Sequence, residues 1–406
     1  MEINMKSLIL FLVVAVLFVG CRDHEEITTY SKTIYYGDIN SDMVVGIDVD
    51  TMSLKSVAAS NGHTPYEISS AFDQELYVIN RQDYTIGIFD TEDDSIVSQI
   101  DLNFMPRSTS INGSDTLVSG VNEPSEAVIT ASTASDTYSD SPYLLPTSFG
   151  GSNATGHPVW VDDDYFLLLD RTENTIELYQ KGVYTPISKV TTSSSVHHVL
   201  NRDGIFYGVL EGKQNDTSPG VIKFSVSNGR IMLIQERLLS TLAGLPIDFE
   251  SATWGSHHAA LHPNAEYIYL GSAEGNVFVL DLETLSLADT FVSGKGIGHF
   301  LFYDDLLITT NHYDTFKSFY DAQIPTENRF IKNLTFSSSI YSGITMQSHT
   351  THIIDGCIYF AFNTDVSSTL YKVDLSTMEI TDALEMNGRY LLMGSFVSTS
   401  TTTDGM

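Results

Sequence analysis

Five segments of the sequence place histidine just before a short apolar run that ends in a turn. They are Gly156-His157-Pro158-Val159-Trp160, Val196-His197-His198-Val199-Leu200, Ser256-His257-His258-Ala259-Ala260, Gly298-His299-Phe300-Leu301-Phe302 and Ser348-His349-Thr350-Thr351-His352. Neutral imidazole suits zinc, copper, iron and nickel, and zinc prefers four ligands arranged as a tetrahedron. Histidines at one position of successive repeats meet if the repeats are arranged in a circle. The spacing therefore predicts a metal site assembled from separate structural units.

Five imidazoles exceed the coordination number of one zinc ion, so we expect three of them to bind it together with a carboxylate or water. The candidate ligands are His157, His197, His257, His299 and His349. Residues expected to support or replace them are His198, His258, His352, Asp248 and Glu250. Alignment of the strands that follow puts His299 in register with His198 and His258, and the other four candidates one residue earlier. His312, which follows a central strand, is expected to lie away from this group.

The histidines belong to a repeated hairpin of short strands separated by turns rich in Asp, Asn and Gly. The clearest copy runs through Tyr267-Ile268-Tyr269-Leu270-Gly271 and Asn276-Val277-Phe278-Val279-Leu280-Asp281. The first strands of the copies begin near Thr33, Leu76, Thr116, Tyr165, Ile205, Tyr267, Leu306 and Cys357. Such apolar runs with turn punctuation at a period of ~40 to 60 residues are typical of four-stranded propeller blades. We predict an all-β fold with a single eight-bladed propeller. Seven blades is the alternative, because the copy at 108–131 is the weakest.

The first copy lacks an innermost strand before it, and Tyr390 to Phe396 near the C-terminus can supply one. Both chain ends would then share a blade and close the ring, which removes open strand edges. We expect the propeller domain to span 32–399, with a tail at 400–406. Two inserts, 122–154 and 240–254, are expected to be loops of this one domain.

Composition and charge restrict the function. The chain carries 20 Lys and Arg against 51 Asp and Glu, a formal net charge of −31. Nucleic acid is therefore excluded as a partner, because phosphate binding needs a basic surface. The sequence contains no nucleophile elbow, phosphate-binding loop, dinucleotide fingerprint or His-Glu-x-x-His motif. We therefore expect a protein that is not an enzyme.

Residues 1–20 are typical of a secretory signal peptide. Lys6 precedes an apolar run from Leu8 to Val19 that is shorter than a membrane span. The run ends in Phe18-Val19-Gly20-Cys21, which resembles a bacterial lipobox and implies a lipid on Cys21. Residues 21–31 would then be a tether. An ordinary signal peptide with a chance cysteine is the alternative. Cys357, in an apolar strand, would have no disulfide partner.

The layout is similar to that of the periplasmic zinc-chaperone propellers called AztD, which partner a zinc transporter. The opening Tyr36-Gly37-Asp38-Ile39-Asn40 looks like that family's first hairpin, and Gly156-His157 looks like its Gly-His-Phe repeat. The His197-His198 doublet, Gly298-His299-Phe300 and His349 fall where that family also places histidines. General YVTN and WD40-like propellers share the hairpins, so only the histidines favour the zinc chaperone. Two features of the family are missing here: a histidine-rich flexible loop and a disulfide.

These patterns predict a zinc-binding propeller lipoprotein in the bacterial cell envelope, with copper as the alternative metal. The resemblance implies a metallochaperone or metal buffer whose partner is a metal-uptake transporter or its binding protein. The protein is expected to be monomeric, held to the membrane by its N-terminal lipid, and to face the periplasm or the outer surface. The alternatives are a lactonase-type metalloenzyme and a non-enzymatic interaction scaffold whose histidines only form hydrogen bonds.

Overall fold

The computed structural model describes residues 26–70, 75–102, 104–112, 115–120, 126–131, 137–138, 143–144, 155–212, 217–242, 255–312, 314–336 and 346–404. The signal peptide, Cys21, Asp248 and Glu250 lie outside the described residues, and His257 and His258 are described by their backbone alone. Within the described part of the chain, no helix is long and apolar enough to cross a membrane.

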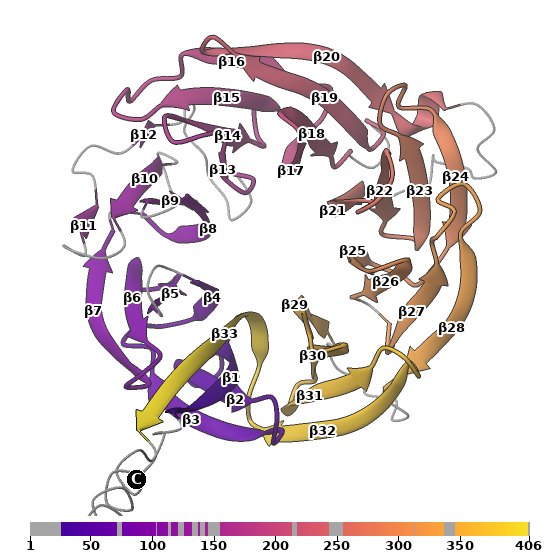
Figure 1. The fold of residues 1–406 in the computed structure, drawn as a ribbon. Helices are drawn as coiled ribbons and strands as arrows, with labels where there is room; N and C mark the ends of the chain where they lie inside the picture. The colour runs from indigo at the N-terminus through magenta and orange to yellow at the C-terminus, as the bar shows by residue number, and fades with distance from the viewer. Residues whose placement is uncertain are drawn as a thin grey trace, which may run out of the picture.

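The described strands form eight antiparallel sheets arranged around a common axis, so the predicted all-β propeller with eight blades is confirmed (Figure 1). We number the blades I to VIII in chain order. Blade I consists of β33 (Leu391–Asp404), β1 (Glu26–Asp38), β2 (Met43–Asp48) and β3 (Ser53–Ala59). Blade II consists of β4 (Pro65–Ser70), β5 (Glu75–Asn80), β6 (Thr85–Asp90) and β7 (Ser95–Asp101).

Blades III to V follow the same order from the axis outward. Blade III consists of β8 (Pro106–Asn112), β9 (Asp115–Gly120), β10 (Glu126–Ala131), β11 (Thr137–Tyr138) and β12 (Tyr143–Leu144). Blade IV consists of β13 (Val159–Trp160), β14 (Tyr165–Asp170), β15 (Thr175–Gln180) and β16 (Ser188–Thr191). Blade V consists of β17 (Val196–Arg202), β18 (Ile205–Leu210), β19 (Gly220–Ser227) and β20 (Arg230–Leu238), followed by a 3-10 turn at Leu239–Thr241.

Three more blades complete the ring. Blade VI consists of β21 (Gly255–Leu261), β22 (Tyr267–Ser272), β23 (Asn276–Asp281) and β24 (Leu287–Val292). Blade VII consists of β25 (Ile297–Tyr303), β26 (Leu306–Asn311), β27 (Phe316–Asp321) and β28 (Arg329–Thr335). Blade VIII consists of β29 (Met346–Ile354), β30 (Cys357–Asn363), β31 (Ser367–Asp374) and β32 (Glu379–Asn387).

The central strands of each blade are apolar because both of their faces are covered by neighbouring blades. In β22 and β18, every residue after the first is buried. In the outer strand β20, by contrast, every residue is exposed or half-buried. Tight turns join the strands, and the turn at Asp203 and Gly204 has positive φ at both residues, which Asp and Gly accommodate at low cost. Burial on both faces therefore explains the near-continuous apolar runs in the sequence.

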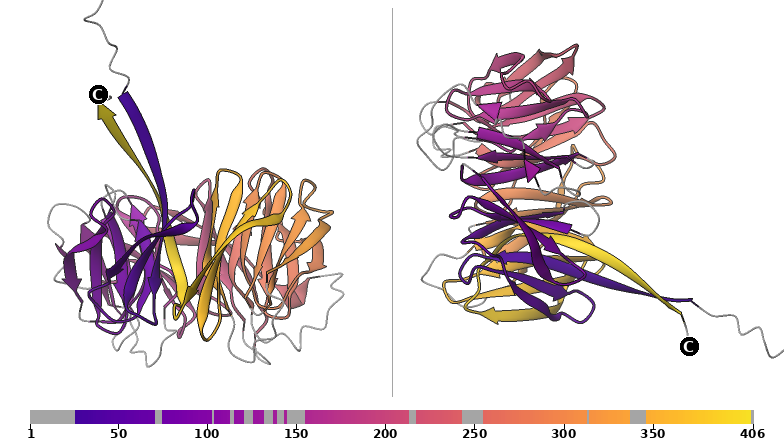
Figure 2. Two further views of the ribbon diagram at one scale, coloured as in Figure 1. Left: turned by 90° about the horizontal axis from the view of Figure 1, so that it is seen from below. Right: turned by 90° about the vertical axis from the view of Figure 1, so that its left-hand side faces the viewer.

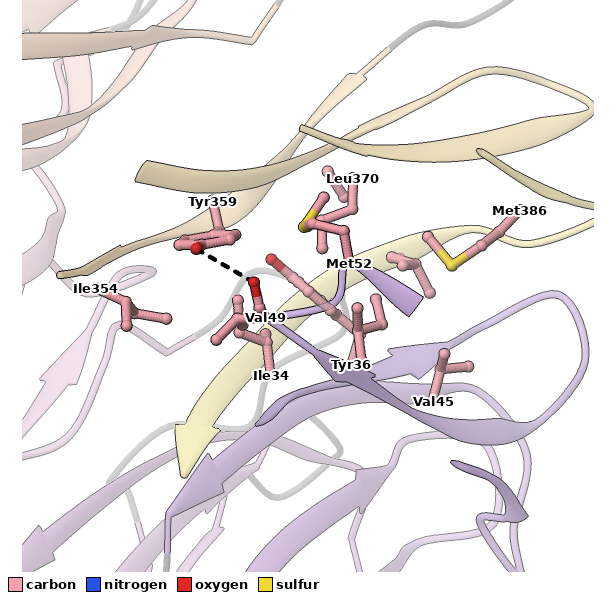
Figure 3. Packing of buried hydrophobic residues seen from close by; sticks show 12 residues of the cluster. Ile34, Tyr36, Val45, Val49, Met52, Ile354, Tyr359, Leu370 and Met386 are labelled. Carbon is pink, nitrogen blue, oxygen red and sulfur yellow. Dashed lines mark hydrogen bonds between the residues drawn. The ribbon is translucent and has the colours of Figure 1, made fainter. Parts of the chain in front are cut away.

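The two ends of the chain share blade I. Strand β33 pairs antiparallel with β1 along its length, and it lies innermost in the sheet. An apolar cluster seals the contact between this blade and blade VIII, where Ile34 and Tyr36 pack with Ile354 and Tyr359 (Figure 3). Similar clusters lie between other pairs of neighbouring blades. The ring is therefore held by apolar contacts between blades and closed by one strand pairing.

Asn363 fastens the start of the closing strand to blade VIII. Its side-chain amide donates to the carbonyl oxygen of Leu391 at 2.7 Å, and its side-chain oxygen accepts from the N–H of Leu391 at 2.9 Å. Both residues are fully buried. Arg389 adds an ion pair to Asp38 at 2.9 Å beside this contact. The closing strand is thus positioned by polar contacts at the rim where it begins.

Two expectations about element boundaries change. Residues 26–31 and 400–404, expected within the tether and the tail, are paired strands of a ribbon that projects from the disc (Figure 2). Pairing in a two-stranded ribbon can continue as long as the two backbones remain side by side, and the threonines in both segments favour strands. The composition therefore does not show where the pairing ends. The expected loop at 122–154 contains β10, β11 and β12, which complete blade III.

Replacing Asn363 with alanine should loosen the ring. The variant leaves the N–H and the carbonyl of buried Leu391 without their side-chain partners, at a cost of about 2–4 kcal/mol in the free energy of unfolding. Denaturant unfolding monitored by tryptophan fluorescence measures the loss. Asn264→Ala, at an exposed turn residue, is the matched control and should change the midpoint little. Equal midpoints for the two variants would contradict the role of Asn363.

Candidate functional site

Every blade has an irregularity at the start of its innermost strand. In blade V, Val196 faces Leu210 and His198 faces Val209, so that His197 is an extra residue. The same slip of one residue occurs in blades II, III and VII, and one of two residues occurs in blades VI and VIII. Such β-bulges re-aim side chains and are frequent next to functional sites. They decide which residues of each blade meet at this rim of the channel.

Equivalent residues can be identified from the strand pairing. In each blade from II to VIII, one residue at the start of the innermost segment faces the sixth residue of the second strand. We call the residue two places after it the rim position. In blades II to VIII it is occupied by Glu67, Ser108, His157, His198, His257, His299 and His349. Five successive blades therefore carry histidine at one topological position.

This register differs from the one expected from the sequence. His299 is in register with His157 and His349 and is not one residue apart from them. His198, not His197, is the equivalent residue of blade V, because His197 is the bulged residue. An alignment of sequence spacings cannot locate a bulge, because the sequence does not show which residue of the strand is the extra, unpaired one.

One group of histidines lies where blades IV and V meet. The ring centroid of His157 is 5.0 Å from that of His197 and 5.8 Å from that of His198. The backbone N–H of His157 donates to the carbonyl of His197 at 2.9 Å, which ties the two blades together. Gly156 permits this close approach, because an added Cβ would lie 2.7 Å from the same carbonyl oxygen.

A second group, which we call the His299 triad, lies where blades VII and VIII meet. It consists of His299, His312 and His349, with ring centroids 5.4, 6.0 and 5.0 Å apart. The expectation that His312 lies away from the other histidines is wrong. His312 directly follows β26 at the rim where β25 begins, and its ring packs on Gly298, whose missing Cβ leaves the space. Its position one residue past the second strand is the signal that sequence analysis missed.

Burial at the rim favours the neutral form of His299 and His157. Burial lowers the pKa of His299 well below its usual value, and His312, His349, His198 and Lys317 lower it further. Burial likewise lowers the pKa of His157, with further lowering by His198, Arg107 and His349. These effects join residues of both groups, so the two groups share one electrostatic environment at the channel rim.

Cationic side chains surround the first group. A guanidinium nitrogen of Arg107 lies 3.2 Å from Nε2 of His197, and because guanidinium only donates, this ring nitrogen accepts. Arg171 forms a two-pronged ion pair with Glu211, with contacts of 2.6 to 2.9 Å, and Ser195 donates to the same carboxylate. His197 therefore has one ring nitrogen engaged by Arg107. None of these charged residues was singled out from the sequence, because each follows or interrupts a strand without a motif.

The triad has a different cationic neighbour. Lys317 is fully buried, donates to Thr310 at 2.7 Å and Thr351 at 3.3 Å, and lies 4.4 Å from the centroid of the Phe360 ring. Burial lowers the pKa of Lys317 to about 7. A large fraction of this amine is therefore neutral near pH 7, which reduces its repulsion of a cation.

The remaining candidates lie elsewhere or outside the description. His257 occupies the rim position of blade VI and His258 follows it, but their side chains, like Asp248 and Glu250, are outside the described residues. The His352 ring lies against Tyr36 between blades VIII and I, 6.2 Å between centroids. His352 is therefore part of the packing between blades.

The geometry can be tested against zinc. At a zinc–nitrogen distance of about 2.1 Å, two imidazoles on a tetrahedral ion have ring centroids about 5.3 Å apart. The three separations in the His299 triad, 5.0 to 6.0 Å, are close to this value. Among the described residues, no three or more His, Cys, Asp or Glu side chains are already arranged to hold a metal ion. The triad has the donor type and spacing, and rotation of its side chains is needed to direct the nitrogens at one point.

Comparison with solved structures places the fold among β-propellers. AztD from Citrobacter koseri has a TM-score of 0.60 and 12% identity, covering 94% of this chain and all of that one. The dihydro-heme d1 dehydrogenase NirN has a TM-score of 0.63 and 11% identity, covering 90% and 74%. BamB from Moraxella catarrhalis has a TM-score of 0.57 and 10% identity, covering 79% and 91%. No family model and no curated protein matches the sequence. At these identities the likeness establishes the propeller fold and does not single out AztD.

Gly298→Ala should displace His312 while preserving the ring. The new methyl group would overlap the His312 imidazole, which must leave the triad. Imidazole NMR signals of His312 and His349 should shift, with little change in the circular dichroism spectrum. Gly87→Ala is the control. A Cβ added at Gly87 would have only one side-chain atom within 3 Å, the flexible tip of Ile96 at 2.8 Å. Unchanged imidazole signals in Gly298→Ala would contradict the packing of His312 on Gly298.

Proposed function

We propose that this protein is a zinc-binding propeller of the bacterial cell envelope that carries or buffers the ion for an uptake system. The observation that carries the proposal is the His299 triad, three imidazoles from two blades with separations close to those around zinc. The sequence resemblance to AztD propellers supports the same function. Zinc would be the cargo, taken up and released by ligand exchange.

Electrostatics favours the triad over the group around His157. Arg107 and Arg171 both lower the pKa of His157, which means that these positive charges also oppose a bound cation there. For His299, the largest effects after burial come from His312, His349, His198 and Lys317, and this lysine has a pKa of about 7. The proposed ligands are therefore His299, His312 and His349, with His257 as a further candidate from the adjacent blade VI. This set replaces His157 and His197 as the principal ligands.

The position of the chain ends predicts how the proposed lipid anchor would orient the disc on a membrane. Leu391, where β33 begins, is fastened to Asn363 at the end of β30, so it lies at the histidine rim. Strand β33 has 14 residues, against seven in β17, and its far end pairs with Glu26. The ribbon thus projects about 20 Å from the opposite rim. A lipid on Cys21 would hold the disc with its histidines facing away from the membrane, open to a soluble partner.

Zinc binding is expected to depend on the triad. Isothermal titration should detect a zinc site in the protein. His299→Gln and His349→Gln should each lower its zinc affinity at least about tenfold, because even the loss of a residue that only supports a metal ligand typically costs that much. Because the pKa of His299 is depressed, few protons compete for it. Affinity should therefore change little from about pH 7.5 to about pH 6.5 and fall only under more acidic conditions.

His63→Gln is the matched control. His63 is exposed, pairs with Asp42 at 2.7 Å and takes no part in the triad. Absence of zinc binding by the unaltered protein, or equal effects of the control and triad variants, would rule out the proposed site. Chelator-sensitive turnover of lactones would favour the hydrolase alternative. An unchanged metal content in all variants would favour the scaffold.

The proposed orientation can be measured in blade V. In a Cys357→Ala background, a fluorophore is attached to Ser193→Cys at the histidine rim or to Asp203→Cys at the opposite rim, both of which are exposed. The two sites are separated by strand β17, about 23 Å long. On vesicles that carry the lipidated protein, energy transfer to a headgroup dye should be stronger from Asp203→Cys. Stronger transfer from Ser193→Cys would reverse the orientation.

A further inference from the structure

Three arginines from consecutive blades lie near one another at the histidine rim. Arg81 follows β5 in blade II, Arg107 is the bulged residue of β8 in blade III, and Arg171 follows β14 in blade IV. Burial lowers the pKa of Arg107 most, and Arg171 and Arg81 add to the effect, as like charges within range of each other do, which brings this pKa to about 10. The protein has only 20 basic residues against 51 acidic ones, so this concentration of positive charge opposes its overall balance.

Only one of the three arginines has a carboxylate partner. Arg171 is neutralised by Glu211 in a buried two-pronged pair. Arg107 donates to the carbonyl of Thr155 and to His197, both of which are uncharged acceptors. Arg81 lies over the Tyr66 ring, 4.2 Å from its centroid, and its buried Nε has no acceptor. Within the described part of the chain, neither Arg81 nor Arg107 forms an ion pair.

Glu67 lies near both arginines, but among the described residues it forms no ion pair with either of them. Arg107 and Arg81 both act on its carboxyl group, which places it near them. One of its oxygens accepts from the N–H and the hydroxyl of Thr109, at 3.3 and 2.7 Å, so the carboxyl group is held by Thr109. The other oxygen, Oε2, is buried without a hydrogen-bond partner, and the side chain is 7% exposed. Oε2 of Glu67 is thus a buried acceptor, and Nε of Arg81 a buried donor, without a hydrogen-bond partner.

Two neighbouring guanidinium groups with incomplete hydrogen bonding are the chemistry that binds oxyanions. Each presents N–H groups in a planar fork that matches two oxygens of a carboxylate or phosphate. We propose that a small oxyanion, carrying a carboxylate or phosphate group, binds between Arg81 and Arg107 at the histidine rim. The Oε2 atom of Glu67, when protonated, donates to the same ligand. Only a small ligand is compatible, because the net charge of −31 repels extended polyanions.

The oxyanion site does not depend on zinc. It uses side chains of blades II and III, whereas the proposed zinc ligands, with the further candidate His257, belong to blades VI to VIII. Arg107 connects the site to His197 through its hydrogen bond, so a bound oxyanion that draws Arg107 toward itself would release Nε2 of His197. Oxyanion binding is therefore tested on metal-free protein.

Thermal unfolding with inorganic phosphate and with citrate as separate probes tests the proposal. At least one probe should raise the Tm by about 2 °C or more over sodium chloride of equal ionic strength. Arg107→Gln and Arg81→Gln should each abolish the increase, and Arg107→Lys, which keeps the charge but loses the planar fork, should reduce it. A response to citrate alone identifies a carboxylate site, and a response to phosphate alone identifies a phosphate site.

Arg230→Gln, at the exposed first residue of β20, is the matched control and should respond like the unaltered protein. No rise with either probe beyond sodium chloride overturns the proposal. So does a rise that survives in Arg81→Gln, which tests the site even if Arg107→Gln fails to fold. Failure of zinc binding in the separate titration leaves this result unaffected.

Discussion

Closure of the ring by one strand pairing is the constraint on which the rest of the structure depends. Strand β33 at the C-terminus pairs with β1 at the N-terminus, and buried Asn363 holds the first residue of β33 by both of its backbone groups. Without this pairing, blade I would lack its innermost strand, and blades I and VIII would expose the apolar surface shown in Figure 3. Closure turns a linear repeat into a circle, in which equivalent residues of successive blades share one rim of one channel.

The bulges determine which side chains of each blade meet at the rim. A regular strand would send adjacent side chains to opposite faces, and the extra residue at the start of each inner strand changes which ones reach the channel. In blade V the bulge places His197 beside Arg107 and leaves His198 equivalent to His157 and His299. In blade VII the bulged residue is Gly298, whose lack of a side chain admits the ring of His312. The same backbone device therefore builds different surroundings in different blades.

The two sides of the rim differ in their electrostatics. In blade VII, burial lowers the pKa of both His299 and Lys317, whereas three arginines lie at blades II to IV. The proposed cation site lies on the first side and the proposed oxyanion site on the second, although the protein as a whole is strongly acidic. Burial makes this division possible, because charges held out of water act on one another over short distances with little screening.

The sequence by itself determined the architecture. Eight apolar hairpins with turn residues at regular spacing predicted eight blades, and the missing strand of the first copy predicted the closing role of the residues after Tyr390. It also predicted histidines on blades IV to VIII, because a repeat conserves position within its unit. Only the tertiary structure decided which histidines are equivalent, since a bulge leaves no mark in spacing or composition. It alone brought His312 to the triad and Arg107 to His197, because these residues meet across blade boundaries that separate them along the chain.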